Sequence, residues 1–321
     1  MKKYKNILKS ILFLIILSLL LVAFSSVLKP PIDEPKVLKG ILSEQDNTMD
    51  YLILGDSEAY SSVSPMEIWS AKGFVGYNIG SSAQSLLNGF EDLEAALDKQ
   101  KPKVLLIESN FFFRDKGMVS EVEKNIGDFF SQFFSIFADH NNWKSYVRDD
   151  KRKDKPDRPV TSPLKGYHYT VDVKPYTKGN YVRESEKTEK IPGYQRQSIE
   201  KIINFAKSYD IKVVLYSAPS PSNWTYPKHN AVSKIALDNS IDYLDLNLLL
   251  SEVGIDWETD TYDAGDHLNY SGALKVSNYL AEYLSNNTEL VNKKSDPNFE
   301  AWANSFKEYS EIIAKKKNRH I

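Results

Sequence analysis

The sequence predicts an α/β fold in which a parallel sheet carries helices on both faces. Short continuous apolar runs, typical of strands buried on both faces, alternate with longer stretches of helical periodicity. This β-α-β-α-β alternation is the pattern of a parallel sheet between two helical layers. With 321 residues, 41% of them hydrophobic, the chain is long enough for one large domain or two small ones.

Five apolar runs predict the strands of this sheet. In open α/β sheets, chemistry sits just beyond the carboxyl ends of the strands, so the polar residues that follow these runs are candidate site residues. The predicted strands are residues 50–54, 76–79, 104–107, 212–216 and 241–244.

Helices are predicted between and after these strands from apolar residues at helical spacing. Pro102 ends the helix that precedes the third strand, and Asp296-Pro297 is an N-cap followed by a first-turn proline that opens the last helix. The predicted helices cover residues 83–98, 196–208 and 271–285, with one more beginning near Met66 and a last one after Pro297.

The N-terminus predicts a membrane anchor. Four lysines precede an uncharged run from Ser10 to Leu28, which is close to the roughly 20 residues that cross a bilayer. Residues 1–29 are therefore expected to form a cytoplasmic stub and an N-terminal transmembrane helix, with the catalytic part of the chain outside the cell. A cleaved signal peptide is the alternative, because Ala23-Phe-Ser25 places small residues at plausible cleavage positions.

Composition divides the rest of the chain into further segments. Three prolines within residues 30–48 predict a linker, and residues 49–290 form the α/β domain, with an insert at about 111–195. The insert carries a phenylalanine-rich helical face and tyrosine-rich segments, and it is expected to cap the substrate side. Residues 291–321 are predicted as a C-terminal helix with a basic tail.

Charge and residue usage exclude several functions. A net charge of −2 argues against nucleic acid as the main partner, because phosphate binding needs a basic face. The chain has no cysteine, which excludes disulfides, thiolate metal sites and a cysteine nucleophile. The histidines other than His267 show no close ligand spacing, so neither a metal nor another cofactor is expected.

Ser57 and His267 are the candidate nucleophile and base. Ser57 follows the first predicted strand in the sequence Gly55-Asp56-Ser57, and His267 lies in a loop of Asp263-Ala-Gly-Asp266-His267. A serine hydroxyl needs a base within hydrogen-bond reach, and that base needs an orienting acceptor. Both Asp263 and Asp266 qualify as that acceptor. Asp263 is favoured because side chains of neighbouring residues, such as Asp266 and His267, tend to point apart.

Three donors are candidates for an oxyanion hole. They are the backbone N–H groups of Ser57 and Gly80 and the side-chain amide of Asn110. Each lies just past the carboxyl end of a predicted strand, so all three are expected to converge at one edge of the sheet.

These residues resemble the four signatures of the SGNH/GDSL hydrolases. The resemblance implies a flavodoxin-like three-layer α/β/α sandwich, ester chemistry, and the serine, histidine and oxyanion roles given above. The sequence departs from the family pattern in having Glu58 where leucine is usual, Phe111 after Asn110, and Ala264 three residues before His267.

The anchor and insert look like a membrane-anchored subset of that superfamily, similar to the D-alanyl transfer protein of lipoteichoic acid synthesis and to alginate O-acetylation proteins. This resemblance implies an extracellular O-acyltransferase acting on a cell-envelope polymer such as a polysaccharide or teichoic acid, beside a membrane-bound O-acyltransferase partner. An extracellular carbohydrate esterase (deacetylase) and a non-catalytic polymer-binding assembly protein are the alternatives, and fold alone does not decide among them.

Overall fold

The computed structural model describes residues 36–114 and 162–317, together with scattered residues between positions 6 and 20. Residues 35–114 and 159–321 group into one compact unit, which contains the sheet. Among the described residues, no helix combines the length and the apolar character needed to span a bilayer. Most of the predicted anchor, the phenylalanine-rich face and the first half of the insert lie outside them.

A five-stranded parallel sheet forms the centre of the domain, as predicted. Its order is β2-β1-β3-β4-β5, which is the flavodoxin-like order. Each strand lies within two residues of its predicted bounds. The strands are β1 (Tyr51–Leu54), β2 (Gly76–Asn78), β3 (Val104–Glu108), β4 (Lys212–Ser217) and β5 (Asp242–Asp245).

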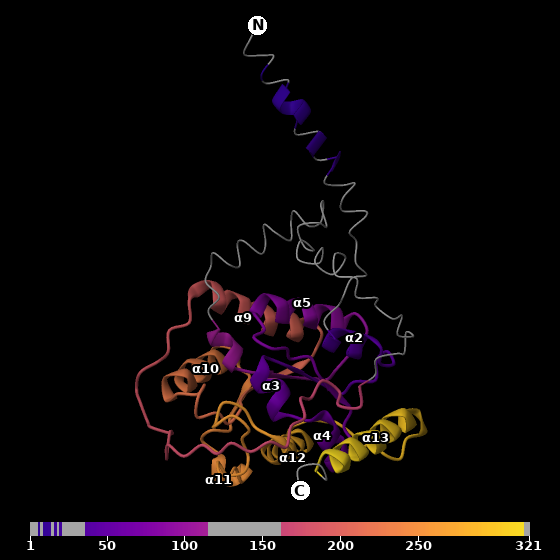
Figure 1. The fold of residues 1–321 in the computed structure, drawn as a ribbon, viewed down its shortest axis with the longest axis vertical. Helices are drawn as coiled ribbons and strands as arrows, with labels where there is room; N and C mark the ends of the chain where they lie inside the picture. The colour runs from indigo at the N-terminus through magenta and orange to yellow at the C-terminus, as the bar shows by residue number, and fades with distance from the viewer. Residues whose placement is uncertain are drawn as a thin grey trace, which may run out of the picture. The chain divides into compact units, whose positions relative to one another are not determined.

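Helices cover both faces of the sheet, which gives three layers (Figure 1). Because side chains alternate along a strand, Leu52 and Leu54 pack into one core and Tyr51 and Ile53 into the other. The first core contains residues of α5 (Leu86–Leu97) and α9 (Gly193–Ser208), and the second contains residues of α3 (Ser57–Ser62) and α12 (Tyr270–Asn287).

The remaining helices include three that the sequence analysis did not predict, namely α2, α10 and α11. The signal for α10 was present, because Thr225 caps it by accepting a hydrogen bond from the Lys228 N–H, and Pro227 stands in its first turn. The other elements are α2 (Lys36–Leu42), α4 (Pro65–Lys72), η1 (Asn110–Phe113), α10 (Tyr226–Asn239), α11 (Leu250–Val253), η2 (Pro297–Phe299) and α13 (Glu300–Lys317).

The structure revises the predicted linker at 30–48. Ile41 of α2 is fully buried, and the buried Glu44 carboxylate lies 2.6 Å from Lys165 Nζ. An apolar anchor and a buried ion pair therefore hold residues 36–48 against the domain. In the C-terminal segment, α13 continues to Lys317, the last described residue.

Residues 162–192, here called the strap, contain no helix or strand. The strap hydrogen-bonds to the loop before α12: Lys174 N–H donates to Thr261 O at 3.0 Å, and Lys174 O accepts from Ala264 N–H at 2.9 Å. Tyr167 and Tyr169, predicted to lie in a cap, are buried in the first core. The strap is therefore tied to the domain and supports the loop that carries His267.

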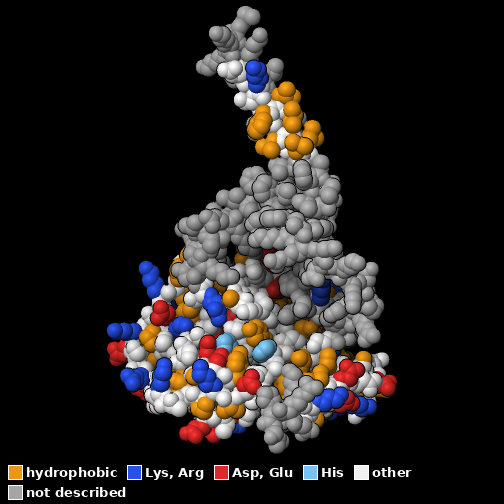
Figure 2. Space-filling view, viewed as in Figure 1, with side chains coloured by type: hydrophobic (Ala, Val, Ile, Leu, Met, Phe, Trp, Pro, Cys, Tyr) orange, Lys and Arg blue, Asp and Glu red, His pale blue; other side chains and the backbone are white. Residues whose placement is uncertain are grey.

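Acidic and basic side chains are interspersed over the described surface that faces the viewer in Figure 2. This mixture agrees with the near-zero net charge.

Candidate active site

Ser57 is the first residue of α3, and only Gly55 and Asp56 separate it from the end of β1. Asp56 caps this helix, since its Oδ1 accepts a hydrogen bond from the Glu58 N–H at 2.9 Å. A Cβ at Gly55 would lie 2.8 Å from the Cβ atoms of both Ala59 and Glu108, so only glycine fits the turn that presents Ser57.

His267 is held by its own loop. Asp263 Oδ1 accepts the His267 backbone N–H at 2.7 Å, and Asp263 Oδ2 lies 2.7 Å from His267 Nδ1. Thr261 Oγ1 donates to His267 O at 2.8 Å and accepts from Gly265 N–H at 2.8 Å. Tyr262 stacks on the imidazole, with ring centroids 5.7 Å apart and planes at 11°. The ring is therefore fixed on one edge and on one face.

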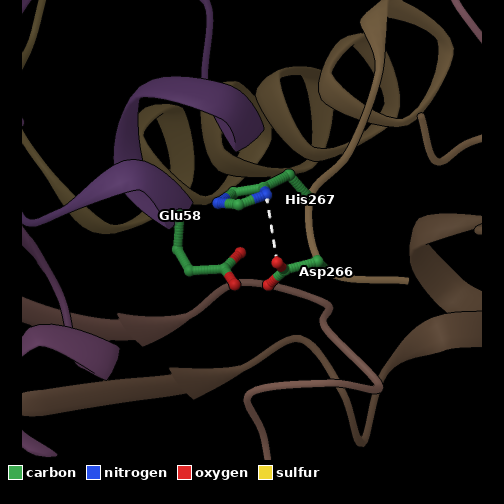
Figure 3. Close-up of side chains that lie close together, drawn as sticks. All are labelled: Glu58, Asp266 and His267. Atoms are coloured by element: carbon green, nitrogen blue, oxygen red, sulfur yellow. Dashed lines mark ion pairs between the residues drawn. The ribbon is translucent and has the colours of Figure 1, made fainter. Parts of the chain in front are cut away.

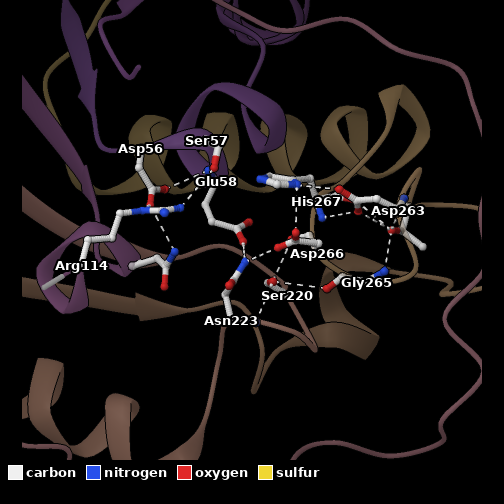
Figure 4. Close-up of polar contacts among 12 residues, drawn as sticks. Asp56, Ser57, Glu58, Arg114, Ser220, Asn223, Asp263, Gly265, Asp266 and His267 are labelled. Atoms are coloured by element: carbon white, nitrogen blue, oxygen red, sulfur yellow. Dashed lines mark hydrogen bonds and ion pairs between the residues drawn. The ribbon is translucent and has the colours of Figure 1, made fainter. Parts of the chain in front are cut away.

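This arrangement leaves the other edge of the imidazole directed toward α3 and Ser57 (Figure 4). His267 Nε2 is buried and has no hydrogen-bond partner among the described residues. Ser57 Oγ instead accepts from Arg114 Nη2 at 3.3 Å. In unliganded enzymes such catalytic contacts are often long and tighten when substrate binds.

Asp266 plays a different part from Asp263. Its Oδ2 lies 3.8 Å from His267 Nδ1, outside hydrogen-bonding distance. Its Oδ1 accepts from Asn223 Nδ2 at 2.5 Å, and the same amide nitrogen is 2.5 Å from Glu58 Oε1 (Figure 4). The geometry therefore favours Asp263 as the acceptor that orients the imidazole. Asp266 instead belongs to a hydrogen-bonded bridge that runs through Asn223 to Glu58 of α3.

The predicted oxyanion donors differ in availability. The Ser57 N–H opens α3 and has no acceptor within the helix. The Gly80 N–H already donates to Asn78 Oδ1 at 3.0 Å. Asn110 Nδ2 donates to Asp56 Oδ2 at 3.2 Å, which uses one of its two hydrogens. Gly80 is therefore not free as a donor in this structure, because its single N–H serves the loop after β2.

A cluster of buried titratable side chains lies beneath the site, and the sequence analysis did not identify it. The Asp56, Glu58 and Glu108 carboxyls are each at most 1% exposed. Arg114 Nε forms an ion pair with Asp56 Oδ2, and Lys228 approaches Asn110 Oδ1 at 3.4 Å. The sequence signal for it was Glu58, which stands where the GDSL signature that this stretch resembles has leucine.

Burial dominates the pKa values in this cluster. It raises the pKa of Glu58 well above 4.5, with smaller contributions from the neighbouring Glu108 and Asp56. It raises the pKa of Glu108 for the same reason, with Asp56 adding to the shift. Burial lowers the pKa of Lys228, opposed by the surrounding carboxyls. Glu58 and Glu108 are therefore biased toward their neutral forms, and Asp56 keeps the direct counter-ion.

Glu58, Asp266 and His267 place ligand-type atoms within 4.8 Å of one another (Figure 3). Asn223 already donates to both carboxylates, and Asp263 engages His267 Nδ1. These contacts satisfy much of the cluster without a cation, so we assign no metal to it. The expected absence of a cofactor stays a prediction.

No family model matches the sequence, and no curated protein matches it. Solved structures do resemble it. A G-D-S-L family protein from Desulfitobacterium hafniense aligns at 13% identity and TM-score 0.41, over 74% of this chain and 99% of the other. The lipase/acylhydrolase from Enterococcus faecalis aligns at 12% identity and TM-score 0.39, over 74% and 96%. The esterase EstA from Pseudoalteromonas aligns at 12% and 0.40, over 74% and 96%.

At such low identity and TM-score, these resemblances decide nothing about activity. The fold and the site themselves define an α/β protein with a serine, a histidine and an aspartate at the carboxyl edge of a parallel sheet.

Proposed function

We propose that this chain is a serine esterase or O-acyltransferase that works through an acyl-Ser57 intermediate. The observation that carries the proposal is the 2.7 Å contact between Asp263 Oδ2 and His267 Nδ1. It leaves Nε2 facing the helix of Ser57, without a hydrogen-bond partner in the described part of the chain. A carboxylate accepts only if Nδ1 carries the proton, so Nε2 of the neutral ring holds the lone pair that a general base needs.

In the first half-reaction, the Ser57 hydroxyl transfers its proton to His267 Nε2 while Oγ bonds to the acyl carbonyl carbon. The imidazolium is stabilised by Asp263, which remains a carboxylate. The proton then passes to the oxygen of the departing alcohol, and the acyl group stays on Ser57. In the second half-reaction, His267 Nε2 takes the proton of water or of an acceptor hydroxyl while that oxygen bonds to the acyl carbonyl carbon. The bond between the acyl carbon and Ser57 Oγ then breaks, and the proton passes from Nε2 to Oγ, which restores the serine hydroxyl.

Donors near Ser57 would bind the oxyanion of both tetrahedral intermediates. The Ser57 N–H and the second amide hydrogen of Asn110 are the two that the geometry favours. Gly80 would join them only if its hydrogen bond to Asn78 opened on substrate binding.

We further propose that the protein is a single-pass membrane protein with its catalytic domain outside the cell. The lysines before an uncharged run of residues 10–28 support this placement. On that placement, the acyl donor is supplied through a membrane-bound O-acyltransferase and the acceptor is a hydroxyl of a cell-envelope polymer. Hydrolysis and transfer share the acyl-enzyme, and only the acceptor differs.

Labelling of the full-length chain with a fluorophosphonate tests the serine chemistry. We expect one adduct, located by peptide mass spectrometry at Ser57, and no adduct in Ser57→Ala. An intact Ser57 that resists labelling while the protein is folded would refute the proposed nucleophile.

Analysis of envelope esters in cells tests the direction of the reaction. If the chain transfers acyl groups, Ser57→Ala lowers the ester content of the polymer to the level of a deletion strain. A rise in ester content in both strains would identify a deacetylase instead. Normal ester content in both would contradict either activity on envelope polymer.

A further inference from the structure

We infer that the pocket next to Gly80 is a binding site for a neutral sugar unit, the part of the acceptor that positions its hydroxyl for the acyl group on Ser57. The inference rests on the proposed acyl transfer and adds the substrate class. The pocket has a volume of about 450 Å³, within the usual range for small-molecule sites.

The lining of this pocket is aromatic and hydroxylic. Its exposed or half-buried side chains are Tyr60, His168, Ser81, Ser82, Ser162 and Leu164, and the buried Tyr77 and Tyr167 form the wall behind them. None of the described residues that line it is a lysine, arginine, aspartate or glutamate.

This lining selects among ligand classes. A phosphate or carboxylate is normally bound by arginine, lysine or a cluster of N–H donors, so the absence of basic residues disfavours an anionic polyol phosphate. A long acyl chain prefers an entirely apolar wall, whereas serine hydroxyls and a histidine line this one. Tyrosine combines an apolar ring face with a polar end, which suits the C–H faces and hydroxyls of a sugar.

Neither Ser57 nor His267 lines the pocket, but lining residues connect it to the surroundings of both. On the serine side, Tyr60 belongs to α3, the helix that Ser57 opens. Gly80 packs against the turn before Ser57, since a Cβ added to Gly80 would lie 3.1 Å from Gly55 O. On the histidine side, the rings form a continuous series. His168 lies 5.7 Å from Tyr60 and 6.2 Å from Tyr262, and Tyr262 stacks on His267.

Backbone contacts hold the walls of the pocket in place. Asn78 N–H donates to Lys165 O at 3.0 Å, and His168 N–H donates to Tyr60 O at 2.9 Å. Gly166 has a φ of +85°, and a Cβ there would lie 1.9 Å from Asn78 O. The strap is therefore seated tightly on β2 and α3, so the site is preformed and binding costs little reorganisation.

Sugar binding can be measured apart from catalysis in the full-length Ser57→Ala chain. The probe is cellotriose, titrated by calorimetry, with glycerol 1-phosphate as the anionic comparison. Ser82 is exposed at this pocket, so Ser82→Trp should obstruct it, and Ser208→Trp makes the same change at an exposed site on α9.

We expect cellotriose to bind and glycerol 1-phosphate not to bind. Ser82→Trp should weaken cellotriose binding by about tenfold or more, whereas Ser208→Trp should leave it unchanged. Equal affinity in both tryptophan variants, or no binding of cellotriose at all, would overturn the inference. In the chain that keeps Ser57, a selective rise in KM for an octanoyl ester caused by Ser82→Trp, with sugar binding intact, would assign the pocket to an acyl chain and also overturn the inference.

The proposed function can fail separately. If Ser57 is not labelled by fluorophosphonate but cellotriose binding still depends on Ser82, the sugar site stands and the acyl chemistry does not.

Discussion

Asp263 and His267 are joined twice within one loop, once from the carboxylate to the backbone N–H and once to the imidazole Nδ1, both at 2.7 Å. The first contact fixes the loop and the second fixes the ring. Asp266, the immediate neighbour of His267, reaches only 3.8 Å from the same nitrogen. Because the loop turns tightly, Asp263, four residues before His267 in the sequence, lies closer to the imidazole Nδ1 than the adjacent Asp266 does.

Replacing Asp263 should therefore harm activity far more than replacing Asp266. Asp263→Asn cannot hold the Nδ1–H tautomer, and we expect kcat for p-nitrophenyl acetate to fall by about 10³–10⁴. Asp266→Asn keeps a hydrogen-bonding group beside Asn223, so a loss of less than about tenfold is expected. Steady-state kinetics on both variants checks this, and the reverse ranking would make Asp266 the orienting residue.

Arg114 should stabilise the fold through Asp56. The Asp56 carboxylate is fully buried, whereas Arg114 is about one-third exposed, with 32% of its side chain accessible. Arg114→Gln leaves the carboxylate without its cation, and we expect the free energy of unfolding to fall by roughly 1–3 kcal/mol after allowance for solvent screening. Urea denaturation measures the change.

A double-mutant cycle isolates this pair. Asp56→Asn removes the charge but keeps an oxygen that can cap α3. In the Asp56→Asn background, Arg114→Gln should cost much less than in the wild type. Equal costs in both backgrounds would show that Arg114 stabilises the fold by packing rather than by charge.

Glu58 should make stability fall as pH rises. Burial raises its pKa well above 4.5, so the folded chain keeps a proton that the unfolded chain releases near that pH. Its stabilising contribution is full below pH 4.5 and is lost as pH rises through the folded-state pKa. From roughly pH 5 to roughly pH 8, we therefore expect the free energy of unfolding of Glu58→Gln to fall less than that of the wild type.

Urea midpoints at the two pH values provide the measurement, and Glu258→Gln, at an exposed position, is the control. A Glu58→Gln curve parallel to that of the control would mean that Glu58 is ionised in the folded chain.

A second serine, histidine and aspartate group should be inactive. Ser233 Oγ lies 3.3 Å from His229 Nε2, and His229 Nδ1 lies 2.7 Å from Asp245 Oδ2. Ser233 sits inside α10, where the backbone N–H groups are used within the helix and cannot bind an oxyanion. We expect Ser233→Ala to keep full esterase activity. A fluorophosphonate adduct on Ser233 would contradict this.

The sequence by itself determined the layered α/β architecture and the loops that carry Ser57 and His267. Strand and helix periodicities are local, and the carboxyl ends of parallel strands share one edge, so both conclusions follow without knowledge of contacts. It also favoured Asp263 over Asp266, from the divergence of adjacent side chains.

Only the tertiary structure decided which donors are free, which charges are paired and which residues line the pocket beside Gly80. Asn78 occupies the N–H of Gly80, Arg114 reaches Asp56 and Ser57, and the strap brings His168 to Tyr60. Each of these contacts joins side chains or segments whose directions depend on packing. Local sequence pattern does not specify these partners, because a hydrogen-bonding group can take any partner that the fold brings within about 3 Å.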